Sequence, residues 1–198
     1  MSEIPALGLR QATLSLVEHD PRWADLYESE VTLIAEALPG VAFEIDHIGS
    51  TAVPGLSAKP ILDIAVRSTN ETQIAAALTG LGYIDRGIRS GRLFIRLRDG
   101  DVRTHNLHLY PPNDTDCLDQ IAFRDALRAD QKLREQYTEL KQSLVESLGD
   151  AGRGQYAARK TNFIKSVIQS QKLKKRAQTG RLRSDGSIVR MTQNYRIS

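Results

Sequence analysis

The residues whose chemistry stands out lie in one stretch, from His47 to Val66. It reads HIGSTAVPGLSAKPILDIAV, and its last part places one carboxylate, Asp63, in an otherwise apolar run. A short apolar run bounded by turn residues is typical of a buried strand. A charge inside such a strand costs free energy unless it is paired or binds a cation. Asp63 is therefore the first candidate for chemistry, and a buried partner for His47, Lys59 or an arginine is the alternative.

The segment before this strand carries groups suited to holding phosphate. Gly49 allows a ligand to approach the backbone closely, Ser50 and its neighbour Thr51 offer hydroxyls, and Lys59 lies just ahead of the strand. Backbone amides, small hydroxyls and cations are the groups that bind terminal phosphates. The alternative for Gly49 and Ser50 is a tight turn or a helix cap.

The elements that must position these residues can be outlined from periodicity and turn signals. Asp20 and Pro21 cap a first helix that Pro39-Gly40 ends. Further helices are expected at about 71–81, 116–130, 131–148 and 153–175, and strands at 41–48, 61–66, 83–84, 92–98 and 102–110. This order predicts an α+β fold, with a mixed β-sheet and helices packed mainly on one side.

Composition sets the broad class of protein. The chain has 198 residues, 40% of them hydrophobic and 26% charged, which suits one globular domain with a real core. No apolar run is long enough to span a bilayer, so we expect no membrane partner. The first residues lack the layout of a signal peptide, and the single cysteine, Cys117, excludes an internal disulfide. We therefore expect a cytoplasmic protein.

Charge divides the chain into two parts. Residues 171–198 hold eight Lys or Arg and one acid, a formal charge of +7, whereas residues 1–170 hold 19 basic and 23 acidic residues, or −4. We expect the basic extension to be disordered. Its charge suits a nucleic-acid backbone, but Tyr195 is its single aromatic residue, so stacking on bases is not supported. Nucleic acid is thus not an expected partner, except through this extension.

The stretch around Asp63 resembles the GrpB family, small proteins assigned to the nucleotidyltransferase superfamily. The matching residues are Gly49-Ser50, Asp63, Val17, His19-Asp20, Trp23, His108-Leu109, Phe123-Arg124-Asp125, Leu127-Arg128, Tyr156, Lys160, Phe163 and Ile164. The resemblance covers about residues 14–168. It implies a nucleotidyltransferase-like domain over residues 14–170, followed by the basic extension.

The resemblance also implies a reaction. A metal-dependent enzyme of this superfamily transfers a nucleotidyl or related phosphoryl group from a nucleoside triphosphate, here to a small-molecule acceptor. Asp63 would hold the metal, and Gly49, Ser50, Thr51 and Lys59 would bind the nucleotide. Mg²⁺ or Mn²⁺ is the divalent metal that the family analogy favours.

The sequence departs from the superfamily pattern where further metal ligands are expected. Side chains two apart on a strand share a face, so the second carboxylate would stand at position 65, which is Ala65. The third would come from the strand 104–110, where Asn106 and His108 share a face that we expect to look toward Asp63. His108 would be the second metal ligand or a general base; a satisfied core histidine is the alternative.

Two further interpretations follow from that departure. A site of one Asp and one His would suit a transition metal better than magnesium. The protein could equally be a non-catalytic nucleotide-binding module with a degenerate metal site. Arg92 and Arg96 share a strand face and are candidates for clamping an anionic substrate, with a solvated strand face as the alternative.

Overall fold

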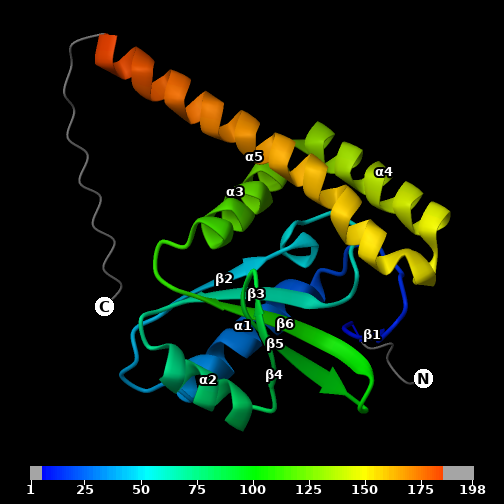
Figure 1. The fold of residues 1–198 in the computed structure, drawn as a ribbon, viewed down its shortest axis with the longest axis vertical. Coiled ribbons are helices and arrows are strands. Elements are labelled where there is room, and N and C mark those ends of the chain that lie inside the picture. Colours follow the sequence, from blue (N-terminus) through cyan, green and yellow to red (C-terminus); the bar gives the residue numbers. More distant parts are fainter. Residues whose placement is uncertain (1–5, 185–198) are drawn as a thin grey trace.

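The computed structural model describes residues 6–184. Its strands are β1 (Leu9–Arg10), β2 (Glu44–Ile48), β3 (Leu62–Arg67), β4 (Ile84–Arg89), β5 (Gly91–Arg98) and β6 (Val102–Tyr110). Its helices are α1 (Arg22–Glu36), α2 (Glu71–Gly80), α3 (Thr115–Ala129), α4 (Gln131–Leu148) and α5 (Arg153–Ser184), with 3-10 turns η1 (Ser50–Ala52) and η2 (Asp150–Gly152). The order of elements agrees with the sequence-based expectation (Figure 1).

The strands form one mixed sheet in the order β2-β3-β6-β5-β4, with β1 paired to the start of β6. Only β3 and β6 pair in parallel among the described strands, and their register sets Asp63 opposite Asn106. A parallel pair needs a crossover connection, which α2, β4 and β5 provide. The mixed sheet expected from the sequence is thus confirmed.

Local sequence explains where the elements begin and end. Asp20 accepts a hydrogen bond from the Arg22 backbone N–H at 2.9 Å, so it caps α1 as expected. Asp99 and Gly100 both have positive φ, 53° and 80°, and form the tight turn between β5 and β6.

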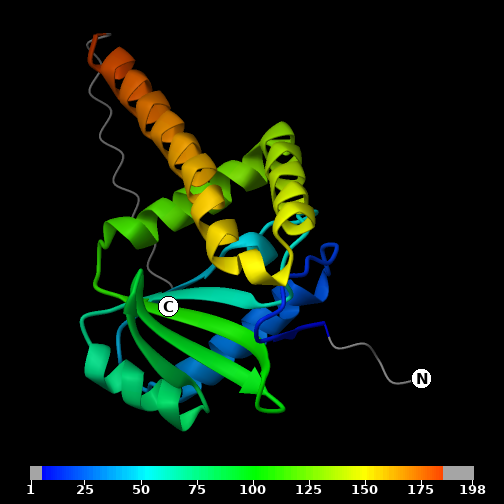
Figure 2. The ribbon, with the colours of Figure 1, turned by 45° about the vertical axis from the view of Figure 1, so that its right-hand side comes forward.

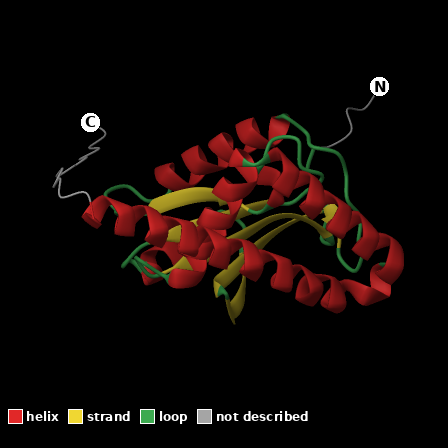
Figure 3. Ribbon diagram, turned by 90° about the horizontal axis from the view of Figure 1, so that it is seen from above, coloured by secondary structure: helices red, strands yellow, loops and turns green. Residues whose placement is uncertain are grey.

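Helices cover both faces of the sheet (Figure 2). α1 and α2 pack on one face around a core that includes Trp23, Ile34, Ile64, Ile74 and Phe94. α3, α4 and α5 lie over the other face and enclose a second apolar cluster with the loop after η1 (Figure 3). The expected α+β fold is thus confirmed: α1 and α2 cover one face, and the C-terminal helices cover the other because β3 is apolar toward both faces.

The last helix continues farther than expected. α5 extends through Ser184. Residues 171–184 of the basic extension are therefore helical, whereas we expected them to be disordered. The end of the helix stands away from the other elements (Figure 1). Residues 185–198 lie outside the described part of the chain. Within residues 6–184, no helix combines the length and apolar character needed to cross a membrane.

Candidate functional site

The turn that leaves β2 holds Gly49 directly against Asp63. Gly49 has φ 70° and ψ −169°, a backbone conformation that is essentially restricted to glycine. A Cβ on this residue would lie 2.8 Å from Asp63 Cβ and 3.0 Å from Asp63 Cγ, and closer still to Oδ2. Only glycine therefore lets the Asp63 carboxylate lie against the backbone that precedes Ser50.

The neighbouring strand adds an amide to the carboxylate. Asn106 Nδ2 donates a hydrogen bond to Asp63 Oδ1 at 2.8 Å, so Asn106 does look toward Asp63 as expected. His108 lies one pair farther along the same face, opposite Ala65. Its Nδ1 lies 2.8 Å from the Ser90 carbonyl oxygen, which only accepts, so Nδ1 donates this hydrogen bond. A ligand or base role for His108 stays a prediction.

A buried lysine from α4 reaches the Gly49-Ser50 turn. Lys141 is 1% exposed, and its Nζ donates to the Ser57 carbonyl oxygen and to Ser50 Oγ, the latter at 3.3 Å. The ammonium group also lies 4.8 Å from the centre of the Tyr137 ring. Burial, with the positive charge of Lys160 adding to it, lowers the pKa of Lys141 to about 7.

Two more lysines flank a single aromatic ring beside this turn. Lys59 Nζ lies 4.7 Å and Lys160 Nζ 4.6 Å from the centre of the Tyr156 ring, distances at which a cation is attracted to the ring. Burial lowers the pKa of Lys160, and the charge of Asp63 acts in the opposite direction. Lys160 thus shares the Tyr156 ring with Lys59 and interacts electrostatically with both Lys141 and Asp63. We call this group the lysine site (Ser50, Lys59, Asp63, Lys141, Lys160).

Thr51 has a structural role next to this site. Its hydroxyl donates to the Ile61 carbonyl oxygen at 3.3 Å and lies 3.0 Å from His47 Nε2. Thr51 is 3% exposed, so these contacts tie the turn to the entry of β3. Burial, and then the charges of Arg128 and Arg124, lower the pKa of His47 to about 3. His47 is thus a neutral structural partner, while nucleotide contact by Thr51 stays a prediction.

Arg92 and Arg96 are not brought to the lysine site. Arg96 pairs in register with His105, so both arginines lie on the sheet face opposite to Asp63. Arg92 binds Asp85 and Glu71 at 2.7 and 3.0 Å. Arg96 binds both oxygens of Glu30, a side chain only 4% exposed, at 2.6 and 2.8 Å. Both arginines thus already bind carboxylates of the protein. Because they lie on the face opposite to Asp63, any substrate that they contact would also have to lie on that face.

The donor set around Asp63 does not fit a resident divalent metal centre. No group of three or more His, Cys, Asp or Glu side chains suited to a metal occurs within residues 6–184. The next same-face position on β3 is Ala65, and the facing amide of Asn106 turns its NH₂ toward Asp63. Mg²⁺ and Mn²⁺ prefer several oxygen ligands. A metal site needs more carboxylates than cations, whereas the lysine site has three lysines and one carboxylate.

Lys141 is the site residue that the sequence reasoning missed. On α4 it follows Tyr137 by four residues and precedes Leu144 by three, which is the spacing of a buried helical stripe. A lysine at such a position is almost never buried without a partner. Its place in the apolar stripe was the signal available in the sequence.

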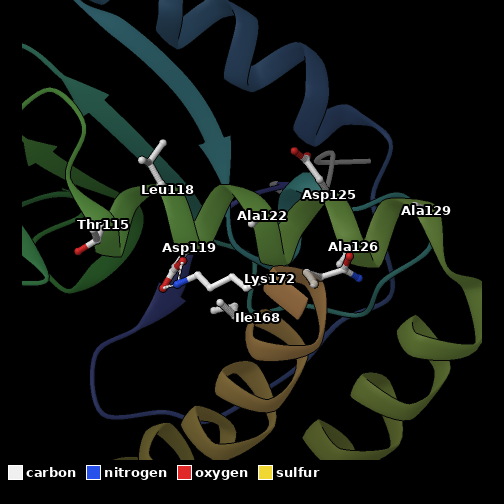
Figure 4. Close-up of a pocket in the computed structure, with 10 residues that line it drawn as sticks. Thr115, Leu118, Asp119, Ala122, Asp125, Ala126, Ala129, Ile168 and Lys172 are labelled. Atoms are coloured by element: carbon white, nitrogen blue, oxygen red, sulfur yellow. Dashed lines mark hydrogen bonds and ion pairs between the residues drawn. The ribbon is translucent and has the colours of Figure 1, made fainter. Parts of the chain in front are cut away.

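Two cavities lie apart from the lysine site. One of about 470 Å³ runs between α3 and α5, and its wall includes Leu118, Ala122, Ile168 and the Asp119–Lys172 pair (Figure 4). The other, of about 700 Å³, lies between α1 and the strands β5 and β6. Neither is lined by a residue of the lysine site.

A Gly-Ser turn that leads into a carboxylate-bearing strand of a mixed sheet, with helices on both faces, defines this as an α+β domain. The family model described as "GrpB protein" matches residues 13–170, and the chain belongs to the GrpB family. The predicted family and fold are thereby confirmed.

Related proteins agree with this assignment. The crystal structure of conserved protein GrpB from Enterococcus faecalis aligns with a TM-score of 0.69 and 28% identity, covering 79% of this chain and 96% of that one. A UPF0157 protein of Halalkalibacterium halodurans is 33% identical over 162 residues, 80% of this chain and 82% of that protein. Another, from Streptomyces coelicolor, is 38% identical over 142 residues, 70% and 74% of the two chains.

A more remote structural match is the Cid1 poly(U) polymerase bound to MgATP. It aligns with a TM-score of 0.47 and 12% identity, over 65% of this chain and 44% of that one. Similarity at this level says nothing about activity.

Proposed function

We propose that this protein binds a nucleoside triphosphate through its phosphates at the lysine site and transfers a nucleotidyl or phosphoryl group to a small-molecule acceptor. The observation that carries the proposal is that the Asp63 carboxylate lies against the Gly49-Ser50 turn, to which the buried Lys141 donates a hydrogen bond. Lysines alone would suffice to hold phosphate, and a carboxylate next to them weakens anion binding. Asp63 therefore calls for a role in chemistry rather than in binding.

The residues have complementary parts in the proposed reaction. The lysines and the Ser50 hydroxyl would hold the phosphates and stabilise the negative charge that develops in the transition state. Asp63 would accept the proton of the acceptor hydroxyl as its oxygen attacks phosphorus. The new oxygen–phosphorus bond forms as the bond to the leaving phosphate or pyrophosphate breaks. Asn106 would orient the carboxylate by its hydrogen bond to Oδ1.

No step in this scheme passes through a metal held by the protein. Because Asp63 is the one carboxylate of the lysine site, a divalent ion would have to arrive already bound to the triphosphate. If the rate of transfer depends on Mg²⁺ or Mn²⁺, the ion therefore acts as part of the metal–nucleotide complex.

The second candidate function is nucleotide binding without turnover. The specific observation that favours it is the replacement of carboxylates by Ala65 and Asn106 on the face that Asp63 shares. Such a module would sense or carry a nucleotide, and Asp63 would be retained only for its contact with Gly49 and its hydrogen bond to Asn106.

Thermal shift and product formation together test these functions. A ligand that binds the native state raises its melting temperature by mass action, so ATP, GTP, CTP and UTP would each be added with and without Mg²⁺, Mn²⁺ or Zn²⁺. Release of pyrophosphate or phosphate is then measured with the nucleotide that binds, in the presence of small hydroxyl-bearing acceptors.

The Asp63→Asn variant separates the candidates. Transfer predicts that the variant still binds nucleotide, at least as tightly because a negative charge is gone, but forms no product. Asp116→Asn, at an exposed position of α3, is the control and should behave as wild type. If no nucleotide shifts the melting temperature under any condition, both candidate functions are wrong.

A further inference from the structure

Resting on the proposed function, we infer that the three lysines take the place of divalent cations, so that this site binds a polyphosphate without a metal ion. The charges of the side chains in the lysine site support this. The lysine site holds Lys59, Lys141 and Lys160 with a single carboxylate, a formal charge of +2 when all four side chains are ionised. A site that recruits metal ions needs the reverse, an excess of carboxylates over cations.

The partners of Lys141 strengthen the inference. Its two hydrogen-bond acceptors in the described part of the chain are neutral, the Ser50 hydroxyl and the Ser57 carbonyl. A buried cation is costly unless an opposite charge compensates it. An anion bound beside Ser50 would supply that charge, and Lys160 lies close enough to interact electrostatically with Lys141 and with Asp63.

The position at which a second metal-binding carboxylate would lie, residue 65, cannot accommodate a charged side chain. Ala65 is fully buried and packs with Ile48, Tyr110 and Cys117 in a small apolar cluster. Even a conservative acidic replacement there would place a charge among apolar side chains. The fold therefore keeps position 65 apolar, while the helices α4 and α5, which lie over the same sheet face, contribute Lys141 and Lys160.

Titration calorimetry with inorganic tripolyphosphate and with ATP, in EDTA and in MgCl₂, tests this inference. We expect Kd in EDTA to be no higher than Kd in MgCl₂, and several-fold lower for tripolyphosphate, because Mg²⁺ neutralises part of the charge that the lysines recognise. Lys160→Met should raise Kd in EDTA by at least tenfold. Lys132→Met, an exposed lysine of α4, should leave it unchanged.

The outcomes separate the inference from the proposed function. Binding of ATP that requires Mg²⁺ overturns the metal-free inference and leaves nucleotide binding standing. A Lys160→Met variant that binds as wild type overturns the role of the lysines. Absence of binding for ATP and tripolyphosphate in both buffers removes the proposed function and the inference with it. Because Lys160 is only partly buried, its variant should fold, and circular dichroism checks this.

Discussion

Replacing Gly49 by alanine should destabilise the protein strongly and disrupt the lysine site. Two costs add at this position. The backbone conformation, φ 70° and ψ −169°, is strained for any residue with a Cβ, at about 1–3 kcal/mol. The new methyl group would also overlap Asp63, whose Cβ and Cγ lie at 2.8 and 3.0 Å. Overpacking of this kind costs about 1–3 kcal/mol more.

The chain offers a matched control that isolates the second cost. Gly149, at the end of α4, has almost the same backbone conformation, φ 54° and ψ −165°, but nothing lies within 4 Å of the place its Cβ would take. Gly149→Ala should therefore lose only the backbone part, about 1–3 kcal/mol. Gly49→Ala should lose about 2–6 kcal/mol in total.

Urea denaturation measures both losses as changes in the free energy of unfolding. The double variant Gly49→Ala, Asp63→Ala completes a cycle, because removing the carboxylate should recover the part of the overlap cost that comes from Cγ and Oδ2, while the Cβ of residue 63 and the backbone cost remain. Equal losses for Gly49→Ala and Gly149→Ala, or additivity of the Gly49 and Asp63 substitutions, would refute the close packing that we describe.

Two further predictions concern the opposite face of the sheet and the buried histidines. Arg96→Met should lower the free energy of unfolding by about 3 kcal/mol, because it leaves the buried Glu30 carboxylate without its cation and with only the Tyr83 hydroxyl as a hydrogen-bond donor among the bonds described. The exposed pair of Arg92 should cost only about 0–1 kcal/mol in Arg92→Met. Neither variant should change nucleotide affinity in calorimetry; a weaker Kd for Arg96→Met alone would place substrate on that face. Burial lowers the pKa of His47 to about 3 and that of His105 to about 4. Unfolded histidines bind protons below about pH 6.5 while the folded ones do not. Stability should therefore fall as pH drops from 6.5 toward 4, by up to about 1.4 kcal/mol per pH unit for each histidine. Replacing both histidines by Gln should flatten the dependence measured by denaturation at several pH values.

The sheet half of the site follows from sequence periodicity. A run of alternating faces places Asp63 on one side of β3, and the strand 102–110 is predicted with its observed bounds. Once these strands pair in parallel, Asn106 must share a face with Asp63, and the structure confirms it. Register in a half-buried sheet is strongly determined by its apolar pattern, which is why this part is accessible from sequence.

The helical half of the site could not be derived in the same way. Lys141 and Lys160 come from separate helices, and their approach to Ser50 depends on how α4 and α5 dock over the sheet. The crossing of helices depends on side-chain packing at each contact rather than on one sequence period. The face taken by Arg92 and Arg96 was misleading for a related reason: alternation shows that they share a face but not which face it is.

The parallel pairing of β3 with β6 also determines when the site can exist during synthesis. The chain must reach Tyr110 before the strand that carries Asp63 gains its second neighbour. It must continue to Lys160 before all three lysines are present. A nascent chain thus completes its sheet while Lys59 is the one lysine of the site that has been made, and Lys141 and Lys160 arrive last. The lysine site is the final part of the domain to be assembled, so a ligand held there can bind only a chain whose helices α4 and α5 have already been made.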